Sequence, residues 1–217
     1  MSILSLMIWA LIILVFLGIG YVSLTLKKLS TPTKGRCIDR ASRPQEALLV
    51  IDMQEDFTRN SGKHAYADEA RDAALEQINR RIADARQTGK HVVFIKNVFR
   101  DAPVIWAMKL TAGGIGTPGR EGLRLDRSLD IKNAPVFEKA IGDSFSNNEL
   151  EEWLEHKQIG ELELVGLDAC HCVQLTAKGA LQRGYTVKIP ETSLLTTSPA
   201  KWGRHKADLI NEGAAFA

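Results

Sequence analysis

The pattern of hydrophobic and polar positions divides the chain into two unlike parts. Residues 3–26 are almost continuously apolar, and the first charged side chain is Lys27. At about 1.5 Å per residue, a helix over this stretch spans about 36 Å, which exceeds the roughly 30 Å of a hydrocarbon core. A cleavable signal peptide normally starts with basic residues and has a shorter apolar core. We therefore predict a transmembrane anchor over residues 1–26.

After residue 46, short apolar runs alternate with helical patterns. The runs are rich in branched residues, which predicts strands buried on both faces of a parallel sheet. They occupy 47–52, 91–96, 136–139, 161–166 and 185–190. Helical periodicity and helix-end signals predict helices over 67–88, 147–156, 172–183 and 199–213. The segment 97–133 shows no firm periodicity. This order predicts a doubly wound, mostly parallel, Rossmann-like sheet in a three-layer α/β/α domain.

Charge sets the expected orientation. Six basic side chains between residues 27 and 43 follow the apolar stretch, against one acidic side chain. By the positive-inside rule, we predict a single-pass protein whose domain, residues 46–217, faces the cytoplasm. The basic linker, residues 27–45, either lies on anionic headgroups or is simply a stop-transfer flank. The formal net charge is only +2, so no nucleic-acid partner is indicated, and three cysteines suit a reducing compartment.

Three reactive side chains stand where predicted strands end. Asp52 closes the first strand, Lys139 closes the third, and Cys172 opens the helix after the fourth. Alone, each has an ordinary reading as a cap, a solvated lysine or a small buried hydrophobe. Ligands of open parallel sheets bind beyond the carboxyl ends of the strands, and a helix N-terminus favours a thiolate. Together, the three positions predict a nucleophile with its activating groups.

Three segments resemble the signature blocks of the isochorismatase-like cysteine hydrolases, in the same order and spacing. They read ALLVIDMQEDF at 47–57, KAIGDSF at 139–145 and VGLDACHCVQLTAKGALQRGY at 165–185. The resemblance runs from about residue 47 to the C-terminus and implies a catalytic triad of Asp52, Lys139 and Cys172. It also implies an oxyanion hole of the backbone N–H groups of Asp168 and Cys172, with a cis peptide bond between Leu167 and Asp168.

The sequence departs from one branch of this family. Nicotinamidases carry a metal site built from an Asp-x-His and a further histidine after the second strand. Here the segment reads KNVFRDAPVIW at 96–106, and no histidine occurs from 92 to 155. We therefore expect no catalytic metal, no other cofactor and no nicotinamide specificity. Candidate pocket residues are Phe57, Phe99, Arg100 and Trp106, although Arg100 could equally be a solvated surface residue.

The leading hypothesis is a membrane-anchored cysteine hydrolase that cleaves an amide or ureido C–N bond of a small molecule, because Cys172 can form an acyl-enzyme. One alternative is an isochorismatase-type vinyl-ether hydrolase, which needs no cysteine nucleophile. Another is a catalytically silent domain held at the membrane for binding. The resemblance also implies a homo-oligomer.

Overall fold

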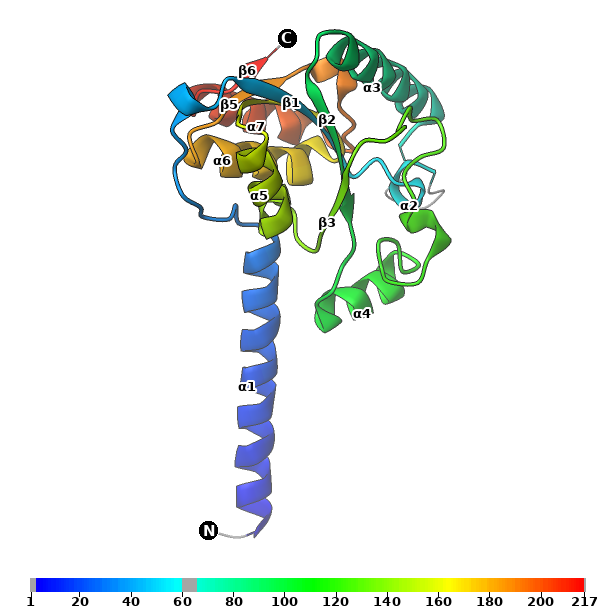
Figure 1. The fold of residues 1–217 in the computed structure, drawn as a ribbon. Coiled ribbons are helices and arrows are strands. Elements are labelled where there is room, and N and C mark those ends of the chain that lie inside the picture. Colours follow the sequence, from blue (N-terminus) through cyan, green and yellow to red (C-terminus); the bar gives the residue numbers. More distant parts are fainter. Residues whose placement is uncertain (1–2, 60–65, 217) are drawn as a thin grey trace.

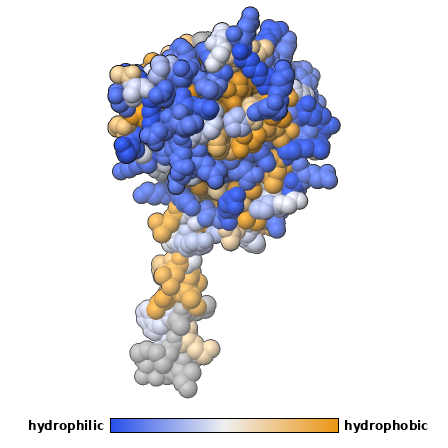
Figure 2. All heavy atoms as spheres, in the orientation of Figure 1, coloured by the Kyte–Doolittle hydropathy of each residue, from blue (hydrophilic) through white to orange (hydrophobic). Residues whose placement is uncertain are grey.

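A computed structural model describes residues 3–59 and 66–216 of the chain. A 27-residue helix, α1 (Ile3–Leu29), projects from an α/β domain (Figure 1). Its window Ile12–Leu29 is long and apolar enough to cross a membrane, judged by length and composition alone. The coloured part of this helix is mostly hydrophobic, whereas the surface of the domain is largely hydrophilic (Figure 2). The helix continues three residues beyond the predicted anchor.

The domain is built on a six-stranded sheet in the order β3-β2-β1-β4-β5-β6, and every pair of neighbouring strands is parallel. The strands are β1 (Gln45–Ile51), β2 (His91–Asn97), β3 (Val136–Lys139), β4 (Ile159–Gly166), β5 (Thr186–Ile189) and β6 (Ala215–Phe216). The doubly wound parallel sheet is confirmed, and only the two-residue β6 was not anticipated. The strand order reverses between β1 and β4, and ligands of such sheets bind beyond the carboxyl ends at this switch point.

Helices cover both faces of the sheet, which gives the predicted three layers (Figure 1). One face packs on α3 (Asp68–Gln87), and the other packs on α5 (Asn148–His156), α6 (Gln174–Gln182) and α7 (Pro199–Asn211). Successive side chains of β1 enter opposite cores, with Leu48 in the core under α3 and Leu49 in the core under the other helices. Burial on both faces explains why this strand is an unbroken apolar run.

The segment without periodicity contains a helix that the sequence did not predict. This helix, α4 (Ala102–Thr111), follows Asp101 at its N-cap and carries Pro103 in its first turn. None of its residues is buried. It therefore lacks the regular apolar stripe that a core-facing helix shows, and this absence is why periodicity could not reveal it. It lies on the side of the domain from which α1 projects (Figure 1).

The expected linker is packed on the domain. Thr33 donates its backbone N–H and its hydroxyl to the Asp143 carboxylate, at 2.7 and 2.6 Å. Arg183, only 1% exposed, donates Nη1 to the Thr33 carbonyl oxygen at 2.8 Å. Further along, Arg40 donates to the Thr186 hydroxyl at 2.9 Å. These contacts hold the inner end of α1 at one place on the domain.

Candidate active site

Three distant segments bring the predicted reactive side chains into contact. Asp52 directly follows β1, Lys139 ends β3, and Cys172 lies in a π-helical turn, Ala169–Val173, that precedes α6. Lys139 Nζ donates to Asp52 Oδ2 at 2.7 Å and to Cys172 Sγ at 3.2 Å. The ammonium group therefore bridges a carboxylate and a thiol at the carboxyl end of the sheet.

The backbone of Asp52 turns sharply at the end of β1. Its φ is 54°, a left-handed conformation that few residues other than glycine adopt. Its N–H donates to the Ile95 carbonyl at 2.9 Å, and its carbonyl accepts from the Gln54 N–H at 2.7 Å. Such conformations persist where the surrounding structure enforces them, and they cluster at functional sites. Here the turn leaves the Asp52 carboxylate beside Lys139.

Two further polar residues belong to the site and were missed in the sequence. Asn97, the last residue of β2, accepts from Lys139 Nζ through Oδ1 at 3.2 Å. Gln54 in turn holds the backbone of Asn97, accepting its N–H at 2.6 Å and donating to its carbonyl at 3.2 Å. Both side chains are buried. The available signal was the position of Asn97 at the carboxyl end of the strand beside β1.

Burial dominates the electrostatics of the carboxylate and the ammonium. Burial raises the pKa of Asp52, and the attraction of Lys139 offsets this only in part. Burial alone would lower the pKa of Lys139, but its interactions with neighbouring groups, above all with the negative charge of Asp52, outweigh burial and raise that pKa. Asp52 Oδ1 has no hydrogen-bond partner among the residues that the structure describes. Lys139 is thus an ammonium cation beside Asp52, a carboxylate whose pKa is raised.

The thiol differs from the sequence expectation. Burial, followed by the charge of Asp52, raises the pKa of Cys172 to about 12, and the opposing effect of Lys139 is smaller. The helix N-terminus had predicted a lowered pKa, because the sequence could not show that the sulfur lies buried beside a carboxylate. In the free protein, Cys172 is therefore a neutral thiol next to a base.

A rigid turn carries Cys172. The peptide bond between Leu167 and Asp168 is cis, as the resemblance implied. The Asp168 carboxylate accepts from the backbone N–H of Cys170 at 2.7 Å and from the Tyr66 hydroxyl at 3.1 Å. Both Asp168 and Cys172 line one cavity. Their assignment as oxyanion donors stays a prediction.

The cavity has a volume of about 640 Å³ and opens at the carboxyl end of the sheet. Phe57 and Phe99, two of the predicted pocket residues, line it. Gly116 packs between their rings, because a Cβ there would lie 2.8 Å from Phe99 and 3.0 Å from Phe57. The sequence did not point to the polar lining residues Lys201 and His205, nor to the lining residues from α1: Leu26, Leu29 and Ser30.

The structure does not bring the other two predicted pocket residues into this cavity. Arg100 is exposed, and its Nη2 donates to Glu138 on β3 at 3.3 Å. Trp106 is 68% exposed on α4. Arg100 is turned toward β3 by its pair with Glu138, and Trp106 is carried away from the strand end by α4.

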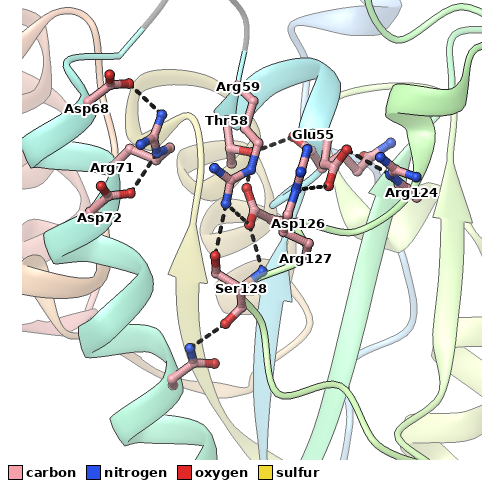
Figure 3. Close-up of polar contacts among 12 residues, drawn as sticks. Glu55, Thr58, Arg59, Asp68, Arg71, Asp72, Arg124, Asp126, Arg127 and Ser128 are labelled. Atoms are coloured by element: carbon pink, nitrogen blue, oxygen red, sulfur yellow. Dashed lines mark hydrogen bonds and ion pairs between the residues drawn. The ribbon is translucent and has the colours of Figure 1, made fainter.

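Ion pairs fix the wall that carries Phe57 (Figure 3). The short helix α2 (Glu55–Thr58) follows the Asp52 turn. Glu55 accepts from Arg124 Nε at 2.7 Å, and the buried Asp126 accepts from Arg59 Nη2 at 2.7 Å. These pairs tie α2 to the irregular segment before β3, so the aromatic wall is held from two sides.

Comparison with known proteins gives matches over most of the chain. The family model described as the isochorismatase domain matches residues 46–215. YddQ, an uncharacterized isochorismatase family protein of Bacillus subtilis, is 28% identical over 156 residues, covering 70% of this chain and 78% of that protein. N-carbamoylsarcosine amidase of Arthrobacter sp is 23% identical over 183 residues, covering 80% of this chain and 68% of that protein. The crystal structure of nicotinamidase PncA from Bacillus subtilis has a TM-score of 0.68 at 25% identity, covering 80% and 99%.

Proposed function

The chain belongs to the isochorismatase family of hydrolases, and on that premise we propose that it is a membrane-anchored cysteine hydrolase that cleaves an amide or ureido C–N bond of a small molecule. Two of its matched relatives are named as amidases, which makes C–N hydrolysis the activity that membership supports. The observation that carries the proposal is the placement of Lys139 Nζ between Asp52 Oδ2 and Cys172 Sγ.

In the first step, Cys172 Sγ attacks the substrate carbonyl carbon while Asp52 takes the S–H proton. A raised pKa makes Asp52 a stronger base, and the Lys139 ammonium stabilises negative charge on the sulfur. Because burial raises the pKa of the Cys172 thiol, proton transfer to Asp52 accompanies the attack. The raised pKa of Lys139 keeps it protonated in the free protein.

The attack produces a tetrahedral oxyanion, which accepts hydrogen bonds from the backbone N–H groups of Asp168 and Cys172. Asp52 then returns its proton to the leaving nitrogen, and the C–N bond breaks to leave a thioester on Cys172. Water attacks the thioester carbonyl while Asp52 takes one of its protons. The C–S bond breaks, the acid departs, and that proton returns to the sulfur. One carboxylate thus serves both half-reactions.

The residues after β2 do not fit the metal site of nicotinamidases. Positions 97–99 read Asn-Val-Phe, and the Asn97 amide oxygen already accepts from Lys139. Within residues 3–59 and 66–216, no group of three or more His, Cys, Asp or Glu side chains is placed to hold a metal ion. We therefore derive no step through a metal and propose a substrate other than nicotinamide, bound against Phe99.

The rest of the chain supports a location at the membrane. We propose an anchor over residues 1–26, a basic segment over 27–45 and a hydrolase domain over 46–217. The candidate span in α1 supports the anchor, and the basic residues after it support a cytoplasmic domain. The packing of Thr33 on Asp143 indicates that the basic segment holds the domain in place and is not a free tether.

The proposal is tested with the detergent-solubilised full chain and three substrate classes: primary amides, N-carbamoyl amino acids and isochorismate. We expect turnover of a C–N substrate, and Cys172→Ala should lower its kcat by more than about a thousandfold while the fold is retained. Cys37→Ala is the matched control, because Cys37 is an exposed thiol outside the cavity, and it should keep wild-type activity.

Three outcomes would contradict the proposal. Amide hydrolysis by Cys172→Ala would remove the nucleophile assignment. Turnover of isochorismate alone, unaffected by that substitution, would identify a vinyl-ether hydrolase. No turnover of any class by the wild-type protein would favour a catalytically silent binding domain.

A further inference from the structure

The inner end of the apolar helix forms part of the active-site wall. Leu26 and Leu29 line the same cavity as Asp52 and Cys172, and both leucines fall within the candidate membrane span Ile12–Leu29. The Leu29 carbonyl packs on the turn after β3, where a Cβ on Gly142 would lie 3.0 Å from its oxygen. An anchor that only localised the domain would have no reason to line its active site.

This placement is secured by buried polar contacts. Thr33 is bonded through its N–H and hydroxyl to Asp143, a fully buried carboxylate, and through its carbonyl to the buried Arg183. At the helix end itself, Lys28 pairs with Asp101 at 3.5 Å, at the start of α4. The helix end therefore meets the cavity at a fixed position.

A second helix exposes apolar side chains near the inner end of α1. Helix α4 contacts α1 and lies beside its inner end (Figure 1). It exposes two large apolar side chains, Trp106 at 68% and Leu110 at 69%. Exposed tryptophan and leucine beside the end of a membrane span are typical of a helix that rests in the headgroup region of a bilayer. The occupant of this surface is thus the lipid in which α1 is embedded.

The cavity wall changes character between these elements and the catalytic residues. Asp52 and Cys172 form a polar floor, and the buried Lys139 bonds to both. Leu26 and Leu29 at the helix end, together with Ile115, contribute apolar wall. A bound molecule that fills both regions must itself be amphiphilic. Its apolar part would lie on the side that continues into the membrane.

We propose that the cavity opens onto the bilayer surface and that the substrate is an amphiphilic amide or ureide drawn from the membrane, with its apolar chain along Leu26 and Leu29 and its C–N group at Cys172. This inference rests on the proposed hydrolase function and names its substrate class. The anchor then gives the active site access to a membrane-borne substrate and also locates the domain at the membrane.

The test uses the full-length chain in phosphatidylcholine vesicles and a series of primary amides from acetamide to decanamide, with ammonia release as the readout. If the acyl chain lies along the apolar wall, kcat/KM should rise about fourfold for each methylene that the wall buries. Leu29→Gln should lower the decanamide-to-acetamide ratio of kcat/KM about tenfold. Leu24→Gln is the matched control on the same helix, 69% exposed and outside the cavity, and should leave that ratio unchanged.

A second measurement does not depend on activity. Phosphatidylcholine brominated on its acyl chains should quench Trp106, seen as the difference in quenching between the wild-type protein and Trp106→Phe. Equal quenching of the two proteins would overturn the placement of α4 on the lipid.

The outcomes separate this inference from the proposed function. Cys172-dependent hydrolysis of acetamide with a flat or falling chain-length series overturns the membrane-borne substrate and leaves the hydrolase standing. Equal effects of Leu24→Gln and Leu29→Gln on the decanamide-to-acetamide ratio would also overturn it, because both effects would then arise from altered insertion of the helix in the membrane. If the wild-type chain hydrolyses no amide of the series but turns over an N-carbamoyl amino acid, the membrane-borne amide is overturned and the hydrolase stands. If it turns over neither class, both proposals fail.

Discussion

The floor of the cavity and helix α4 are opposite in the exposure of their side chains. At the floor, charged groups are almost fully removed from water, with Asp52 1% exposed and its partner Lys139 3% exposed. On α4, outside the cavity, apolar side chains are left uncovered, with Trp106 and Leu110 both more than two-thirds exposed. Buried charge and exposed apolar surface are each unfavourable in water unless something compensates for them.

The compensation differs between the two regions. At the floor it comes from inside the domain, where Lys139 bonds to Asp52, Asn97 and Cys172. On α4, which has no buried residue and packs no core, we propose that it comes from lipid. The floor is therefore where we place the chemistry, and α4 is where we place contact with lipid. Substitutions in the two regions should therefore change different properties of the protein.

The largest effect is expected at the floor, from Lys139→Met. The substitution leaves the Asp52 carboxylate buried without its partner, so the free energy of unfolding should fall by about 3–5 kcal/mol and turnover should be lost. Chemical denaturation of the solubilised protein checks the first result. Lys96→Met is the matched control, since Lys96 pairs with Glu138 at a partly exposed position, and it should cost less than about 1 kcal/mol. Equal losses of unfolding free energy in the two variants would contradict the contrast between a buried and a partly exposed lysine.

Asp52→Asn should separate thiol reactivity from catalysis. The negative charge of Asp52 raises the pKa of Cys172, so neutralising it should move the alkylation profile of Cys172 to lower pH. At neutral pH, iodoacetamide should then modify Cys172 faster in the variant, although hydrolysis is slower because the base is gone. Mass spectrometry of the cysteine peptides across pH measures this. If the pH midpoint for alkylation of Cys172 in the wild-type protein lies at or below about 8.5, the ordinary pKa of cysteine, this expectation is wrong and Cys172 is already a thiolate.

Thr33→Val tests the link between the two regions. The loss of its hydroxyl removes the 2.6 Å hydrogen bond to the buried Asp143 carboxylate and should cost about 1–3 kcal/mol. Because Thr33 holds the end of α1, the preference for decanamide over acetamide should fall with it. Thr31→Val is the control, since its hydroxyl bonds only to the Lys27 carbonyl within the helix end. An unchanged preference in Thr33→Val would mean that the segment does not position Leu26 and Leu29.

The smallest effect is expected from Arg100→Ala. Arg100 lies outside the cavity and forms one exposed ion pair with Glu138, worth at most about 1 kcal/mol. Both KM and kcat for an amide carrying a carboxylate should stay within about twofold of wild type. A large rise in KM would restore Arg100 as a substrate-binding residue.

The sequence predicted most where one local pattern dominates. Burial of β1 on both faces requires an unbroken apolar run, and that run placed Asp52 at the carboxyl end of a strand. Lys139 and Cys172 were found because each follows or ends another strand, and the family resemblance joined the three. Asn97 escaped notice because an asparagine at a strand end has many ordinary roles, and only its 3.2 Å contact with Lys139 distinguishes it.

Local sequence determined the apolar helix and the parallel strands and marked three reactive side chains at strand ends, because periodicity and strand ends are properties of neighbouring residues. The family resemblance then joined the three. Tertiary structure alone decided how those side chains behave. The direction of the Cys172 pKa depends on how much water reaches the sulfur and on a carboxylate 120 positions earlier in the chain. The position of Leu29 at the cavity depends on Thr33 meeting Asp143, 110 residues away. Burial and charge at such separations arise only when the chain has folded.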